Sequence, residues 1–128
     1  LPLLAPVDPE TALVFIDQGL HFDRHLLSRG IDGNEQVVRL VFRLQQRGEV
    51  LMNLGRSEEA LACFEEMARR GRIARRAEPI EGELGFHRDQ LRTYAKALDR
   101  LGRTDTRDAI LAEIEELGEP EEGDSSAD

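Results

Sequence analysis

The chain has few of the residues that crosslink or anchor a protein, because its only cysteine among 128 residues is Cys63 and it has no long apolar run. A single cysteine cannot form an internal disulfide, and without an apolar run neither a secretory signal nor a membrane span is predicted. We therefore expect a reducing, cytoplasmic location with no membrane contact. Because position 1 is Leu rather than Met, a fragment or processed form stays open as an alternative.

The sequence also lacks the side-chain patterns that carry catalysis, with no glycine-rich phosphate loop, nucleophile elbow or cluster of metal ligands. His21 and His25 have a spacing that can chelate a metal on a helix, but Phe22 stands where the zinc-protease motif requires Glu. Cys63, beside Phe64 in an apolar stripe, is typical of a buried small hydrophobe. We predict no enzyme activity, no cofactor and no metal site.

The composition is that of one globular domain, with 40% hydrophobic and 34% charged residues. The net charge of −9 is uneven, because residues 1–112 hold all 17 bases and 18 acids, whereas 113–128 hold eight acids and no base. Residues 118–128 combine this charge with the absence of any large apolar side chain, a composition typical of disorder. We predict one helical-repeat domain over 1–117 and a disordered acidic tail over 118–128.

Apolar residues recur every three or four positions, which predicts amphipathic helices, and nowhere do they alternate as in strands. Asp8 and Pro9 form a helix start, and Ser57 and Thr104 are predicted to cap later helices. The Gly- and Glu-rich residues 80–85 are expected to form a link. The predicted fold is all-α without a sheet. Five helices are expected: over 9–29, from a cap at Asp32 to about 54, from 57 to an end between 71 and 78, along an apolar stripe over 91–101, and over 104–117.

The tripeptide Leu-Gly-Arg occurs twice between predicted helices, at 54–56 and 101–103, which predicts stacked helical hairpins. Residues 41–74 resemble the tetratricopeptide repeat, a 34-residue hairpin, with Gly48 at its close-approach position and Ala60 at its small position. Residues 88–117 fit a partial second copy, although the two glycines stand 47 residues apart. The resemblance is degenerate and implies a helical solenoid that binds a peptide or helix of a partner protein.

In the tetratricopeptide family the first helix of each hairpin lines the binding groove, which implies candidate positions here. Phe42 and Met52 would be apolar anchors, while Arg92, Lys96 and Arg100 would orient an acidic segment. We predict a non-catalytic adaptor or scaffold whose partner is another protein or an acidic peptide. The implied positions are Phe42, Gln45, Glu49, Met52 and Asn53 in the first hairpin and Asp89, Arg92, Lys96, Asp99 and Arg100 in the second.

A basic cluster between 69 and 76 is the other candidate site. On a helix Arg69, Arg72 and Arg76 share a face that can hold phosphate, nucleic acid or an acidic peptide. The plainer interpretation is a solvated helix end, in which neighbouring Glu65 and Glu66 pair with the arginines. A third interpretation has the acidic tail fold back onto this cluster and compete with an acidic partner.

Two other functional classes remain open. The chain could be a structural or regulatory domain of a larger protein, or a homodimer formed through the helix over 9–29, because a short solenoid leaves its ends uncovered. Residues 55–71 are also similar, more distantly, to the pentatricopeptide repeat, which implies RNA binding. The nearly neutral charge of residues 1–112 and the irregular repeat spacing argue against nucleic acid.

Overall fold

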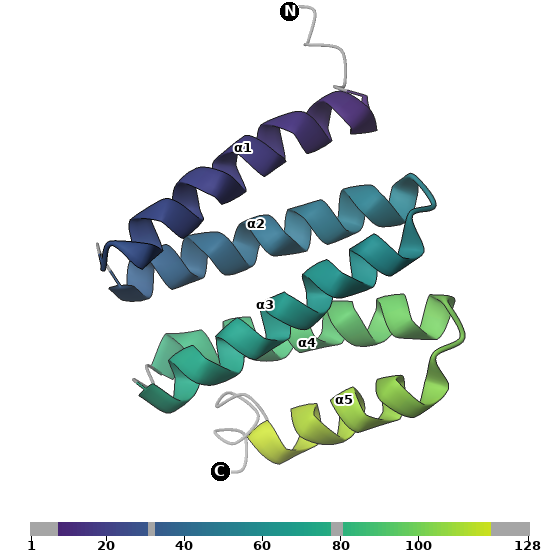
Figure 1. Cartoon of the computed structure of the whole chain (residues 1–128). Helices are drawn as coiled ribbons and strands as arrows, with labels where there is room; N and C mark the ends of the chain where they lie inside the picture. The colour runs from purple at the N-terminus through teal and green to yellow at the C-terminus, as the bar shows by residue number, and fades with distance from the viewer. Residues whose placement is uncertain (1–7, 31–32, 78–80, 119–128) are drawn as a thin grey trace, which may run out of the picture. The chain divides into compact units, whose positions relative to one another are not determined.

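The computed structural model describes residues 8–30, 33–77 and 81–118, and nearly all of them are helical (Figure 1). The prediction of an all-α fold with five helices is confirmed, and these three ranges contain no strand. The chain divides into two compact units, Leu1–Met67 and Ala68–Asp128, which are described in turn. The helices are α1 (Pro9–Ser28), α2 (Gly33–Asn53), α3 (Ser57–Ala77), α4 (Glu81–Arg100) and α5 (Thr104–Leu117).

The start of α1 follows the predicted chemistry. The Asp8 carboxylate accepts a hydrogen bond of 2.8 Å from the backbone N–H of Thr11, and Pro9 occupies the first helical position. Hydrogen bonding by Thr11 lowers the pKa of Asp8 because it favours the ionised carboxylate. Asp8 and Pro9 therefore take the roles at the helix start that the sequence predicts.

The first Leu-Gly-Arg turn closes α2 with a Schellman motif. The N–H of Arg56 donates to the carbonyl oxygen of Leu51 at 2.9 Å, and that of Gly55 donates to Met52 at 3.0 Å. Gly55 has φ of 77°, a left-handed conformation that L side chains rarely adopt. The chain therefore leaves α2 and enters α3 within three residues.

The second Leu-Gly-Arg turn has the same pattern. The N–H of Arg103 donates to Leu98 at 2.9 Å, the N–H of Gly102 donates to Asp99 at 3.1 Å, and Gly102 has φ of 75°. The repeated tripeptide thus gives a repeated backbone structure, which joins α4 to α5 as the first turn joins α2 to α3.

The predicted N-caps of α3 and α5 are wrong. Ser57 and Thr104 are the first helical residues, and the preceding Arg56 and Arg103 occupy the cap positions. The carbonyl of Arg56 already accepts the N–H of Ala60 at 3.0 Å. The reason is the Schellman turn, in which the residue after the glycine closes one helix and begins the next.

The predicted link over 80–85 is also wrong, because α4 already begins at Glu81. Glycines at 82 and 85 each cost about 1 kcal/mol relative to alanine in a helix, an amount that tertiary packing routinely outweighs. The predicted cap at Asp32 and the part of the predicted tail beyond Gly118 lie outside the described residues.

In the first unit α1 and α2 run antiparallel and pack together, and the N-terminal part of α3 adds the Phe64 ring (Figure 1). Gly48 of α2 makes the fit possible, since a β-carbon there would lie 2.6 Å from two ring atoms of Phe64. Ala60 is fully buried, as its small size predicts. The largest fully buried apolar side chains of this unit are Phe64, Leu40, Leu44, Leu51 and Met67.

In the second unit α4 and α5 run antiparallel, and the C-terminal part of α3 packs with them. A β-carbon on Gly71 of α3 would lie 2.5 Å from Nδ1 of His87, so the imidazole fills the space that this glycine leaves. Leu91, Leu98 and Ile110 are buried in this unit.

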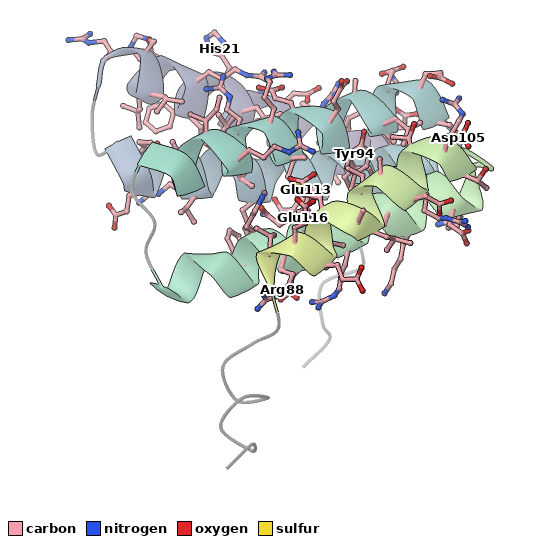
Figure 2. The ribbon with its side chains drawn as sticks, turned by 90° about the horizontal axis from the view of Figure 1, so that it is seen from below. His21, Arg88, Tyr94, Asp105, Glu113 and Glu116 are labelled. Atoms are coloured by element: carbon pink, nitrogen blue, oxygen red, sulfur yellow. The ribbon has the colours of Figure 1, made fainter. Side chains whose placement is uncertain are left out.

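Two arginines tie α5 to its neighbours in the second unit. Arg72 of α3 donates through Nε and Nη2 to both carboxylate oxygens of Glu113, at 2.7 and 2.8 Å. Arg88 of α4, which is 4% exposed, donates through Nη1 to the carbonyl oxygen of Gly118 (Figure 2). Guanidinium groups therefore hold α5 at Glu113 and the chain at Gly118, just after the last residue of α5.

Within the described residues, every helix is too short or too polar to cross a membrane.

Candidate binding groove

The second unit contains a groove of about 610 Å³ between α4 and α5. Because the two helices run antiparallel from the Gly102 turn, side chains from both helices border the same space. The lining residues are Arg92, Ala95, Lys96, Asp99 and Arg100 from α4 and Arg107, Leu111 and Ile114 from α5.

The floor of the groove is apolar. Ala95 is buried, Ile114 is half-buried, and Leu111 is 46% exposed. Counted from the Leu-Gly-Arg turn, Leu111 takes the position that Phe64 takes in the first hairpin, and Ala95 takes that of Gly48. Leu111 stays partly exposed at a position where the first hairpin buries the Phe64 ring.

Three bases of the rim lie along one side of α4, since Arg92, Lys96 and Arg100 are four residues apart. Arg92 is 2.8 Å from Asp89 one turn earlier. Lys96 and Arg100 are exposed and, within the part of the chain that the structure describes, make no ion pair or side-chain hydrogen bond. Two positive charges therefore remain available to an acidic ligand.

Arg107 of α5 supplies a fourth base. Its guanidinium contacts the carboxylate of Asp99 across the groove, and its Nη2 lies 2.9 Å from Asp108. Hydrogen bonds with Asp99 and then Asp108 raise the pKa of Arg107, so it is charged at all physiological pH values. Asp99 is the only acid among the lining residues, and the groove therefore has an excess of positive charge.

The structure brings the second-hairpin candidates Arg92, Lys96, Asp99 and Arg100 together in this groove. Asp89 does not line it and instead pairs with Arg92. Sequence reasoning missed the residues from α5, because the helical period shows which residues share one helix face but not which face of α5 meets α4.

The first-hairpin candidates belong to α2 of the first unit and do not line this groove. Phe42 and Asn53 are exposed, and Met52 is half-buried. Gln45 donates to Glu49 at 3.4 Å along the helix. These residues are surface positions of α2 in the described structure.

Of the three arginines predicted to share a face in the basic cluster, the structure describes the side chains of Arg69 and Arg72. Arg69 is exposed, but Arg72 binds Glu113 through two hydrogen bonds, and the side chain of Arg76 lies outside the described residues. Glu66 of α3 lies 2.7 Å from Arg24 of α1. Arg72 therefore serves as a tie between helices.

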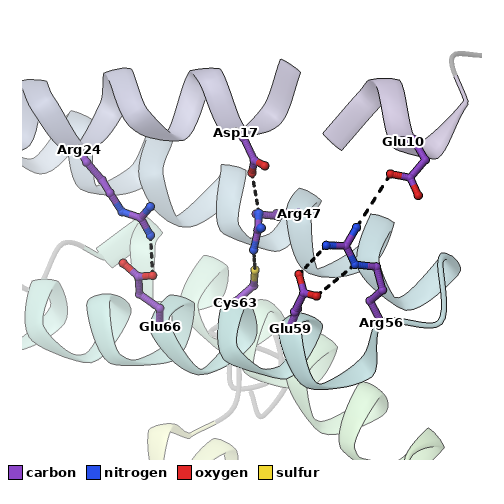
Figure 3. A network of polar contacts seen from close by, with 8 residues as sticks. All are labelled: Glu10, Asp17, Arg24, Arg47, Arg56, Glu59, Cys63 and Glu66. Atoms are coloured by element: carbon purple, nitrogen blue, oxygen red, sulfur yellow. Dashed lines mark hydrogen bonds and ion pairs between the residues drawn. The ribbon is translucent and has the colours of Figure 1, made fainter. Parts of the chain in front are cut away.

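A polar pocket of about 390 Å³ lies among the helices of the first unit. Arg47 of α2 donates to Asp17 of α1 at 2.6 Å and to Cys63 of α3 at 3.1 Å, so one side chain joins three helices (Figure 3). Arg24 and Glu66 line the same pocket and pair with each other. The charged groups of this pocket neutralise one another. We therefore interpret the pocket as a set of polar contacts that join the helices.

Cys63 lines this polar pocket, and its side chain is buried. Burial raises the pKa of the Cys63 thiol, and the hydrogen bond from Arg47 opposes this effect only in part. The predicted burial of this side chain is confirmed. A thiol of raised pKa holds little thiolate, the reactive form, at neutral pH.

His21 and His25 are both exposed on α1. His21 lines the polar pocket, whereas His25 does not. The described residues contain no group of three or more His, Cys, Asp or Glu side chains that could hold a metal ion.

Comparison of the chain with protein-family models, with curated proteins and with solved structures found no match. The chemistry of the residues themselves is therefore the basis for the function proposed below.

Proposed function

We propose that the chain is a non-catalytic protein-interaction module, an adaptor or scaffold, whose α4/α5 groove binds an acidic amphipathic helix or peptide of a partner protein. The observation that carries the proposal is an apolar floor bordered by four bases and a single acid. Apolar side chains of the ligand would contact Leu111 and Ile114, and its carboxylates would meet Lys96 and Arg100.

A degenerate tetratricopeptide-like repeat is the proposed architectural basis for this function. The equal hydrogen-bond patterns of the two Leu-Gly-Arg turns support it. The contact of Phe64 with Gly48 and the complete burial of Ala60 support the packing that the resemblance implies for the first hairpin.

The groove chemistry favours binding over catalysis. Among the described lining residues of the groove, none is a His, Cys, Ser or Tyr that could act as nucleophile or general base near neutral pH. We therefore propose no cofactor and no reaction. A buried cysteine without a disulfide is compatible with a reducing compartment, which supports the proposed cytoplasmic location.

Fluorescence anisotropy with designed peptides tests the proposal. The probe is a labelled peptide with Leu at helical positions i, i+3, i+4 and i+7 and Glu at most other positions. A control peptide has the same composition in scrambled order, and a second control replaces each Glu by Lys. We expect binding of the acidic amphipathic probe alone, with affinity that falls as salt is added.

Two matched variants locate the binding site. Leu111→Asp places a charge in the floor and is expected to reduce affinity at least about tenfold. Ile73→Asp places the same charge at another exposed apolar position of the second unit and is expected to leave affinity unchanged. Equal loss in both variants, or equal binding of the scrambled peptide, would refute a specific groove. Tighter binding of a single-stranded RNA of similar charge would move the function to nucleic acid.

Self-association through α1 is a second candidate function. Phe15 and Phe22 are 62% and 56% exposed and stand two helical turns apart on the same side of α1. Light scattering of the chain and of Phe15→Asp measures this directly. A dimer that dissociates in the variant would support it, whereas a monomer in both samples would exclude it.

A further inference from the structure

The groove is built for an acidic ligand, and the same chain contains an acidic segment immediately after the last described residue. Residues 119–128 hold Glu119, Glu121, Glu122, Asp124 and Asp128 and no base. The apolar residues of this segment are small, namely Pro120 and Ala127. It could therefore satisfy the basic rim but not cover the apolar floor.

The chain leaves α5 close to this rim. Arg88 of α4 donates to the carbonyl oxygen of Gly118, which holds residue 118 beside α4. Arg92, the first base of the rim, follows Arg88 by one helical turn on the same side of α4. Gly118 has φ of 88°, a value that glycine tolerates, and it is the C-cap of α5.

The length of the segment suits this path. From Arg88 to Arg100 the α4 axis rises about 18 Å, at about 1.5 Å per residue. Ten residues in extended conformation span about 33 Å, so roughly half of the segment reaches the far base. The acids at 121, 122 and 124 are thus within reach of Lys96 and Arg100, the two bases with no ion pair to a described residue.

We infer that the acidic segment 119–128 docks in cis along Arg92, Lys96 and Arg100 and occupies the basic rim of the α4/α5 groove. The contact is ionic and exposed, so it is weak and sensitive to salt. It differs from the interpretation that placed the acidic tail on the basic cluster of α3, because Arg72 of that cluster is engaged by Glu113. A consequence that rests on the proposed function is that a partner with both acids and apolar side chains displaces the segment.

Paramagnetic relaxation tests the docking without any partner. A nitroxide is attached to Ser126→Cys in the full chain, and labelling of the parent chain, whose own cysteine is buried, gives the background. We expect selective broadening of the backbone amides of 92–100 at low salt and its loss at high salt. Broadening centred on Arg69 and Arg72 instead, or uniform weak broadening, would overturn the inference.

Two further full-length variants check the ion pairing. Neutralising the segment by replacing its five acids with Gln and Asn, or reversing the rim by Lys96→Glu with Arg100→Glu, should each abolish the selective broadening. A matched reversal on another surface, Arg69→Glu with Arg70→Glu, should leave it intact. Persistence of the broadening in the first two variants would contradict an ionic contact.

The effect on partner binding is measured separately with the acidic amphipathic peptide. The neutralised segment should raise its affinity about threefold to tenfold, as expected when a weak tethered competitor is removed. Equal affinity in both proteins would overturn the competition. If the peptide binds neither protein, the proposed function fails, while the relaxation data still decide whether the segment docks.

Discussion

The carboxylate of Asp23 is 1% exposed and accepts a hydrogen bond of 2.7 Å from Nε of Arg43. The two side chains join α1 to α2 inside the first unit. The guanidinium also lies over Gly19, where a β-carbon would be 2.4 Å from Cζ of Arg43. Asp23 is therefore a buried charge whose one partner within the described residues, Arg43, reaches solvent at 36% exposure.

Because only Asp23 of the pair is fully buried, we expect removal of Arg43 to lower the free energy of unfolding more than removal of the Asp23 charge. Arg43→Met should lower the free energy of unfolding by about 3 kcal/mol, because it leaves a buried carboxylate without its counter-charge. Asp23→Asn should cost only about 1 kcal/mol, because the arginine keeps its contact with water. Urea unfolding of both variants measures the difference, and Arg43→Lys is the control that keeps the charge. Equal costs for the two substitutions would show that the pair does not act through burial of Asp23.

The close approach of Gly48 to Phe64 predicts that the effect of Gly48→Ala on stability depends on the size of the side chain at position 64. In the parent chain Gly48→Ala should destabilise by about 1 kcal/mol or more, because overpacking against a buried ring outweighs the better helix propensity of alanine. In a Phe64→Leu background the ring is gone, and the same substitution should be neutral or stabilising. Gln46→Ala, at an exposed position of α2, is the control for propensity alone. A penalty that persists in the Phe64→Leu background would contradict the steric explanation.

The features that could be predicted from sequence are those decided by local chemistry. Asp8 and Pro9 favour a helix start, and Gly55 and Gly102 end a helix because few other residues tolerate positive φ. The start of α4 at Glu81 could not be predicted, since glycines at 82 and 85 oppose a helix that tertiary packing stabilises. Local rules therefore located the turns and the helix starts beside them, but not the start of α4, which depends on tertiary packing.

The α4 side of the candidate groove could be predicted from the sequence, but the α5 side could not. Arg92, Lys96 and Arg100 share one side of a helix, and a four-residue spacing is visible in any sequence. Leu111 and Arg107 enter the groove because of how α5 packs on α4. Such information lies in pairs of residues far apart in sequence.

The ion pair of Arg72 with Glu113 is a case of such a distant pair, 41 residues apart. Its two parallel hydrogen bonds and partial burial predict a coupling energy of about 1 kcal/mol in a double-mutant cycle with Arg72→Gln and Glu113→Gln. Arg72→Lys should lose most of it, since an ammonium group cannot make both bonds in the same plane. The control is the more exposed pair of Arg56 with Glu59, which is expected to couple more weakly because solvent screens it. Equal coupling of the two pairs would refute a special role for Arg72.

Cys63 predicts an inert thiol and a defined dependence of stability on pH. Burial raises its pKa in the folded state, while the unfolded chain keeps the ordinary value of about 8.5. The folded state therefore holds its proton longer, so the stability that this group contributes is complete below pH about 8.5 and is lost as the pH rises through the folded-state pKa. Alkylation by iodoacetamide at pH 8 should be much slower than in concentrated urea.

The hydrogen bond from Arg47 to Cys63 allows a second test of the thiol chemistry. Because that bond favours the thiolate, Arg47→Gln should raise the pKa of Cys63 further and slow alkylation at a given pH. Cys63→Ala should remove the part of the alkaline stability loss that belongs to the thiol, which is measured as the difference between the two unfolding curves across pH. Faster alkylation in Arg47→Gln would mean that the arginine protects the thiol by blocking access, and that burial rather than charge controls its chemistry.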